Sequence, residues 1–204
     1  MDSTDNGVGP SEPAGIVLIG LPGSGKSSVG AALAQRLSLE FIDTDDVIEA
    51  HLQMKVSEIF AQLGEDRFRQ LERETLEELV KSRRGQRLVL SVGGGLPVPD
   101  HNRLLLHQIG RLVYLKASLS ELVNRLKSDQ SRPLLNPGGR SRTATTDEPP
   151  DGERALHERL QSLLDRRSQA YEEADIIIET SGLTIPEVAA RVEKALNTYS
   201  PNVK

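Results

Sequence analysis

The chain contains no cysteine and no tryptophan, and only 3% of its 204 residues are aromatic. The absence of cysteine excludes disulfides, thiolate metal sites and cysteine nucleophiles. The scarcity of aromatic rings argues against the stacking platforms that bind single-stranded nucleic acid. No apolar run approaches the length of a membrane span. The formal net charge of -5 further argues against nucleic acid or an acidic membrane surface as the main partner.

The beginning of the chain is polar and lacks the basic and apolar segments of a secretory signal. We expect residues 1–14 to form a disordered tail and residues 199–204 a second, C-terminal tail. The length between them suits a single domain, at residues 15–198. The expected location is the cytoplasm, and a mature organellar protein that has lost its transit peptide stays open as an alternative.

The strongest motif is the sequence GLPGSGKS at residues 20–27, which fits the phosphate-loop pattern G-x-x-x-x-G-K-[ST] in full. A predicted aliphatic strand at 16–19 precedes it, and the apolar spacing over 29–37 predicts a helix after it. Backbone N–H groups at the start of such a helix bind phosphate, and glycines let the backbone approach it. In this pattern Lys26 reaches the β- and γ-phosphates and Ser27 binds Mg²⁺.

Short aliphatic runs alternate with segments of helical spacing along the chain. The predicted strands lie at 16–19, 39–42, 87–92, 112–115 and 175–179. This alternation predicts an α/β fold whose parallel sheet is covered by helices on both faces.

One segment, residues 128–152, is rich in proline, glycine and small polar residues that cannot build a core. We expect it to be a mobile loop. A lid over an active site and a plain disordered insertion are the two alternatives. We favour a lid for the end that contains Arg132 and disorder for the remainder.

Carboxylates follow the second predicted strand, at Asp43, Asp45 and Asp46. Asp46 and Glu49 have capping-box spacing and are expected to begin a helix. Asp43 and Asp45 are not needed for that cap, and alternation places both on one side of an extended segment. Because the carboxyl ends of parallel strands bind ligands, we predict a functional role for this pair.

Two further features are ambiguous when each is taken alone. Glu65, Arg69, Glu72 and Arg73 share one face of a predicted helix, which is typical of a solvated lattice of ion pairs. Residues 93–95 are three glycines that follow a predicted buried strand. They indicate either a tight turn or a close approach of the backbone to another group.

The ordered set of motifs resembles the shikimate kinase family, over nearly all of residues 16–196. The set consists of the phosphate loop, Asp43-Thr44-Asp45, Gly64-Glu65…Phe68-Arg69…Glu72, Gly93-Gly94-Gly95, Arg132-Pro133-Leu134-Leu135 and Arg167…Tyr171. The resemblance implies a P-loop, nucleoside-monophosphate-kinase-like sandwich of three layers with sheet order 2-3-1-4-5. It also implies transfer of the ATP γ-phosphoryl group to the 3-hydroxyl of shikimate, a step towards chorismate and the aromatic amino acids.

The same resemblance implies roles for individual residues. Asp45 is the candidate catalytic base, and Lys26 with the lid residue Arg132 would stabilise the transferring phosphoryl group. The expected metal is Mg²⁺, held by Ser27 and, through water, by Asp43. The expected shikimate-binding residues are Asp45, Arg69, Gly93, Gly94, Gly95 and Arg167. The expected ATP-binding residues are Gly23, Ser24, Gly25, Lys26, Ser27, Ser28, Arg125, Arg132 and Pro186.

The implied partners are therefore ATP and shikimate alone, for a monomer that binds neither nucleic acid nor a membrane. Gluconate kinases and adenylate-type kinases share the fold and are the nearest rival enzymes. A regulatory GTPase would need an N-K-x-D motif, which the sequence lacks. A catalytically dead, ligand-binding descendant would be expected to have lost Lys26, Asp45 or Arg132, and all three are present.

Overall fold

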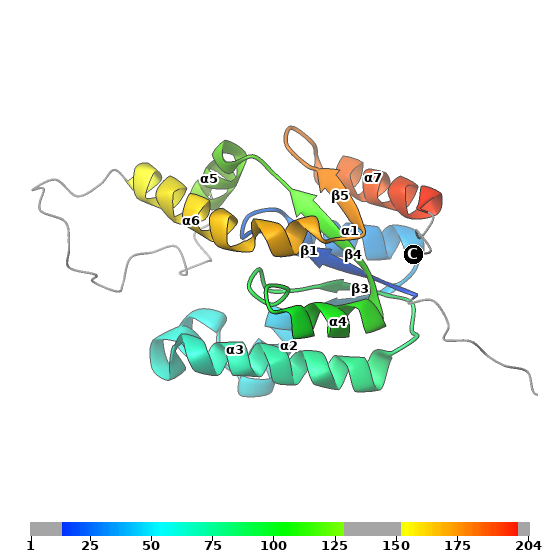
Figure 1. The fold of residues 1–204 in the computed structure, drawn as a ribbon, viewed down its shortest axis with the longest axis horizontal. Coiled ribbons are helices and arrows are strands. Elements are labelled where there is room, and N and C mark those ends of the chain that lie inside the picture. The colour runs from blue at the N-terminus through cyan, green and yellow to red at the C-terminus, as the bar shows by residue number, and fades with distance from the viewer. Residues whose placement is uncertain (1–13, 129–151, 200–204) are drawn as a thin grey trace, which may run out of the picture.

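A computed structural model describes residues 14–128 and 152–199 of the chain (Figure 1). Its elements are, in order, β1 (Gly15–Ile19), α1 (Lys26–Leu37), β2 (Glu40–Asp43), α2 (Thr44–Leu52), α3 (Val56–Arg83), β3 (Leu88–Ser91), α4 (Asp100–Ile109), β4 (Gly110–Lys116), α5 (Leu119–Ser128), α6 (Gly152–Glu172), β5 (Ile176–Glu179) and α7 (Ile185–Thr198). All but one residue of each expected tail, almost all of the expected loop and its Arg132 lie outside the described residues.

The five strands form one parallel sheet in the order β2-β3-β1-β4-β5, which confirms the predicted topology. The central strand, β1, is buried along its whole length. Successive side chains of a strand point to opposite faces. Ile16 and Leu18 accordingly join the core on one face of the sheet, and Val17 and Ile19 the core on the other.

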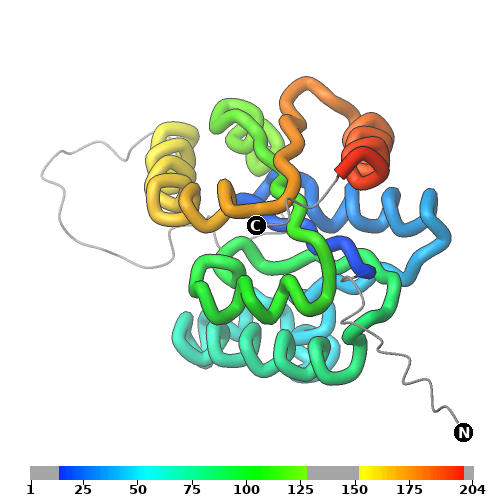
Figure 2. Tube along the Cα trace, turned by 45° about the vertical axis from the view of Figure 1, so that its right-hand side comes forward, coloured from blue at the N-terminus to red at the C-terminus, as the bar shows by residue number. Residues whose placement is uncertain are grey.

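Helices cover both faces of the sheet, so the fold is the predicted three-layer sandwich (Figures 1 and 2). Side chains of α1 and α7 build the core on one face. Side chains of α3, α4, α5 and α6 build the core on the other face. Within the described ranges, no helix is long and apolar enough to cross a membrane.

Helix α3 is bent at Gly64, whose φ of 80° and ψ of 171° are not helical. A residue without a Cβ takes this conformation at little cost. A small apolar cluster joins the two parts of α3 to α2, through Ile48, Ile59, Phe68 and Leu71. The bend and this cluster together hold the charged segment after Gly64 beside the carboxyl end of β2.

The start of α2 differs from the prediction. The helix begins directly after β2, and its N-cap is Asp43, whose Oδ1 accepts a hydrogen bond from the Asp45 N–H at 3.0 Å. The expected cap by Asp46 and Glu49 is therefore wrong. Glu49 accepts hydrogen bonds from the Val56 N–H at 2.9 Å and the Lys55 ammonium at 2.7 Å instead. Asp45 consequently lies in the first helical turn and not in an extended segment.

Candidate active site

The phosphate loop joins β1 to α1, and Gly25 is the N-cap of α1 with a φ of 90°. The Lys26 side chain is buried, and its Nζ donates hydrogen bonds to the carbonyls of Gly20 at 3.0 Å and Leu21 at 3.1 Å. A buried ammonium needs such partners. These two hydrogen bonds hold the Lys26 side chain against the phosphate loop.

Two predicted metal-site residues are directly bonded to each other. Ser27 Oγ donates a hydrogen bond to Asp43 Oδ2 at 2.7 Å, while Asp43 Oδ1 caps α2. Asp43 is buried at the end of β2, opposite Ser91 of β3. Mg²⁺ prefers oxygen ligands and is usually bound by one or two protein groups together with phosphates and water. The oxygen pair of Ser27 and Asp43 fits that ion.

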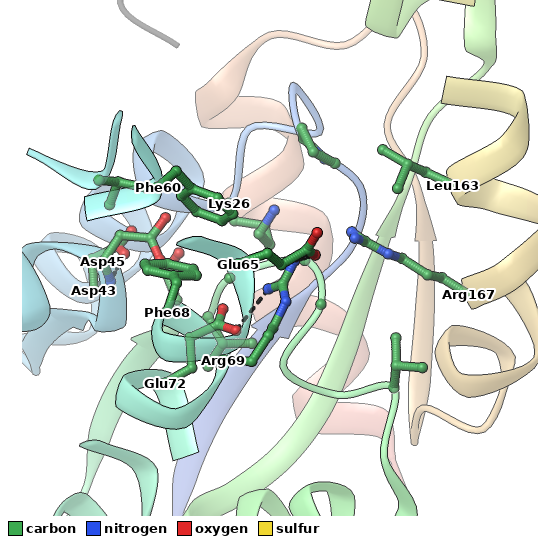
Figure 3. A pocket seen from close by; sticks show the side chains of 18 of the residues that line it. Lys26, Asp43, Asp45, Phe60, Glu65, Phe68, Arg69, Glu72, Leu163 and Arg167 are labelled. Carbon is green, nitrogen blue, oxygen red and sulfur yellow. Dashed lines mark hydrogen bonds and ion pairs between the residues drawn. The ribbon is translucent and has the colours of Figure 1, made fainter. Parts of the chain in front are cut away.

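A cavity of about 530 Å³ opens beside the phosphate loop (Figure 3). Its walls come from the start of α2, the first part of α3, the loop after β3, and α6. Asp43 and Asp45 lie on one side of it, and Arg167 points in from α6 on the other (Figure 3). The predicted pair of aspartates thus meets in one cavity, although Asp45 reaches it from a helix.

Arg69 lies in the same cavity and is held by two carboxylates. Its guanidinium pairs with Glu72 at 2.7 Å and Glu65 at 3.0 Å, and lies over the Phe68 ring. Burial lowers the pKa of Arg69, but the two carboxylates outweigh that effect and raise it. The Arg69 pairs of the predicted lattice therefore exist, and they direct a charged guanidinium towards the cavity.

The glycines after β3 leave room for the arginines of the site. An added Cβ on Gly95 would lie 2.5 Å from Arg69 Nη1, and one on Gly94 would lie 3.0 Å from Arg167 Nη1. An added Cβ on Gly93 would collide with Glu72 Oε1. Of the two interpretations of this triplet, the close approach of other side chains to the backbone is the one that requires glycine.

Glu72 is an acidic side chain at the bottom of this cluster and is only 1% exposed. Its Oε2 pairs with Arg69, while its Oε1 has no hydrogen-bond partner among the described residues. Burial raises the pKa of Glu72, and the charge of Asp45 adds to that rise, whereas Arg69 and Arg167 oppose it. Asp45, Glu72, Arg69 and Arg167 therefore form one electrostatically coupled group.

A second cavity, of about 490 Å³, lies on the other side of the phosphate loop. Lys26 and Ser27 line both cavities. The other predicted nucleotide-site residues found in its lining are Gly23, Ser24, Gly25, Ser28 and Arg125. Pro186 is not among the lining residues, although its neighbours Thr184 and Ile185 are.

Arg125 binds the phosphate loop from α5. It pairs with Glu121 at 2.6 Å, and its guanidinium donates to the carbonyls of Gly23 at 3.4 Å and Ser24 at 3.5 Å. A further hydrogen bond reaches the Thr180 carbonyl at 3.3 Å. Arg125 therefore connects the glycine loop to the segment after β5.

Some lining residues were not predicted. Arg159, Leu163 and Arg166 line the larger cavity together with Arg167. Their spacing of four, seven and eight residues from Arg159 puts all of them on one face of α6. That spacing is visible in the sequence, but only the packing of α6 shows that this face is turned towards the cavity.

The fold and these two cavities define a P-loop kinase that acts on a small anionic acceptor. A phosphate loop separates a nucleotide-sized cavity from one that is lined by arginines and carboxylates. The shikimate kinase family model matches residues 22–197. The chain belongs to the shikimate kinase family, whose members are ATP-dependent kinases.

Individual relatives agree with this assignment. A shikimate kinase of Thermodesulfovibrio yellowstonii is 39% identical over 91% of this chain and 96% of the relative. One of Legionella pneumophila is 40% identical over 89% of this chain and 93% of the relative. A solved shikimate kinase of Acinetobacter baumannii, in complex with shikimate, is 31% identical with a TM-score of 0.76, covering 96% of this chain and 97% of that one.

Proposed function

We propose that this chain transfers the γ-phosphoryl group of ATP to the 3-hydroxyl of shikimate, giving shikimate 3-phosphate and ADP. The observation that carries the proposal is the sharing of Lys26 and Ser27 by the two cavities. A nucleotide in the smaller cavity would present its phosphates to an acceptor in the larger one. Phosphoryl transfer depends mainly on such positioning and on neutralisation of charge.

The acceptor would be held by its carboxylate and its hydroxyls. Arg69 and Arg167 would bind the carboxylate, because a planar guanidinium can hold both oxygens of that group. Glu72 would orient Arg69 through the 2.7 Å ion pair. The backbone of residues 93–95 would face the ring, where the lack of side chains leaves space. Asp45 would bind the reacting hydroxyl.

In the transfer step, the 3-oxygen would bond to the γ-phosphorus as the bond to the β-phosphate oxygen breaks. The hydroxyl proton would pass to the Asp45 carboxylate, and ADP would leave. Lys26, and Arg132 from outside the described residues, would neutralise the transferring group. Mg²⁺, held by Ser27 and through water by Asp43, would supply further positive charge to the phosphates.

The reaction is tested by a coupled ADP-release assay with shikimate, gluconate and AMP as acceptors. We expect ADP release that depends on shikimate and on Mg²⁺, with at most trace activity on the other two acceptors. Phosphorus NMR of the product should show one phosphate ester, at the 3-position. ADP formation that does not depend on shikimate would contradict the proposal.

Arg69→Ala is expected to raise the KM for shikimate on the order of 10–100-fold, because one charge-assisted contact to the carboxylate is lost. The KM for ATP should stay within about threefold, since Arg69 does not line the nucleotide cavity. Steady-state kinetics with each substrate varied would measure both constants.

Arg67→Ala is the matched control for that variant. Arg67 lies on the same helix but does not line the acceptor cavity, and it forms an exposed ion pair with Glu74 at 3.3 Å. Exposed pairs contribute little to stability, so both KM values should remain those of the parent. An unchanged KM for shikimate in Arg69→Ala would exclude its role in acceptor binding.

A further inference from the structure

Tyr171 is a buried residue near the end of α6 that does not line the acceptor cavity. Its ring packs on the Tyr114 ring, with centroids 5.0 Å apart. Its hydroxyl donates a hydrogen bond of 2.6 Å to the carbonyl oxygen of Gly94. The phenol therefore joins α6 to the glycine segment after β3.

The same hydroxyl lies near Arg167, which is one helical turn earlier on α6. The charge of Arg167 acts on the Tyr171 phenol. The position of an added Cβ on Gly94 lies 3.0 Å from Arg167 Nη1 and 3.3 Å from the Tyr171 hydroxyl, so both groups meet at this glycine. Because a guanidinium can only donate, the phenol oxygen is free to accept from Arg167 while its hydrogen is donated to Gly94.

The phenol must keep its proton to donate to the Gly94 carbonyl. Burial raises the pKa of Tyr171, and the charge of Arg167 opposes that rise without reversing it. The hydroxyl is consequently protonated at neutral pH, so a single side chain reaches two neighbouring groups of the cavity wall.

We propose that Tyr171 is a positioning residue for the acceptor: it sets the guanidinium of Arg167 and the backbone of Gly94 relative to each other. This inference rests on the proposed roles of Arg167 and Gly94 in binding shikimate. Without the hydroxyl, Arg167 keeps its charge but loses the neighbouring acceptor that orients it, and the Gly94 carbonyl loses its donor. Binding of the acceptor carboxylate weakens, and binding of ATP does not.

Tyr171→Phe tests this inference, because it removes the hydroxyl and keeps the ring. The KM for shikimate should rise by up to about tenfold, the scale of one hydrogen bond. The kcat and the KM for ATP should stay within about twofold, because neither the reacting hydroxyl nor the nucleotide cavity is touched. A KM for shikimate equal to that of the parent overturns the inference.

Tyr114→Phe is the matched control. It removes a hydroxyl from the other ring of the same stacked pair, and across residues 14–128 and 152–199 that hydroxyl makes no hydrogen bond. Tyr114→Phe should keep the parental KM for shikimate. An equal rise of the KM for shikimate in both variants would show that weaker packing of the two rings, and not the orientation of Arg167, causes the effect.

A neutral acceptor separates positioning from a general structural role. With an amide in place of the shikimate carboxylate, parent and Tyr171→Phe should differ by less than about twofold, because an aimed guanidinium has no carboxylate to bind. In an Arg167→Ala background, adding Tyr171→Phe should likewise change the KM for shikimate less than about twofold. A full-sized further rise in either case contradicts the inference.

The proposed roles of Arg167 and Tyr171 are distinguished by their variants. If Arg167→Ala leaves the KM for shikimate unchanged, the proposed role of Arg167 is wrong. If Arg167→Ala raises that KM while Tyr171→Phe does not, only the role of Tyr171 is wrong. Should Tyr171→Phe fold poorly, NMR of the parent gives a second test: shikimate should shift the Tyr171 ring signals more than those of Tyr114, and equal or absent shifts contradict the inference.

Discussion

The Asp45→Asn variant is expected to lose about 10²–10⁴ in kcat for shikimate phosphorylation, the usual contribution of a general base. The amide keeps the size of the side chain, and the helix start should survive because the cap uses the Asp45 backbone N–H and the Asp43 carboxylate. The variant should therefore still bind shikimate. Rapid-quench kinetics with bound ATP and shikimate would measure the chemical step directly.

Two further measurements make that result specific. Asp46→Asn, at the exposed neighbouring position of the same helix turn, should keep the parental kcat. The pKa of Glu72 should fall in Asp45→Asn, because the charge of Asp45 helps to raise it, and carboxyl-carbon NMR would follow that change. A kcat within threefold of the parent would remove Asp45 from the role of base.

The Lys26→Ala variant is expected to lose about 10²–10³ in kcat, the scale for one electrostatic donor removed from a transition state. Lys26 is the charged residue that lines both cavities, so its loss leaves the transferring phosphoryl group without its nearest fixed cation in the phosphate loop. Shikimate binding measured without nucleotide should change little. Single-turnover kinetics at saturating ATP would separate slower chemistry from weaker nucleotide binding.

Lys81→Ala serves as the control, since Lys81 is an exposed lysine near the end of α3 and lines neither cavity. It should be as active as the parent. Thermal unfolding of Lys26→Ala should also be recorded, because the substitution removes hydrogen bonds to the carbonyls of Gly20 and Leu21. Near-normal turnover by a folded Lys26→Ala would refute its role in transfer.

Local sequence patterns predicted the parallel sheet and the position of the phosphate loop, and the order of the strands followed from the family resemblance. Strands such as Ile16–Ile19 are short aliphatic runs, and the glycine pattern at 20–27 has one well-known use, so neither depends on distant contacts. The start of α2 could not be predicted in this way. Asp43 and Asp46 are both good caps by type, and the pairing of β2 with β3 brings the strand up to Asp43, where the helix begins.

The candidate site, like the fold, could be predicted only in part from the sequence. The chain alone determines which chemical groups are available: a phosphate loop, an Asp-Thr-Asp segment, three glycines and a few arginines, in an order that resembles one family. Tertiary structure decides how these groups meet. Three features bring separate elements together. Ser27 and Asp43 are joined by a hydrogen bond of 2.7 Å, and Arg159 and Arg166 face the cavity from α6. The phenol of Tyr171 lies near Arg167 and donates to Gly94. Such contacts depend on how strands and helices pack, and residue type and spacing along the chain do not specify that packing.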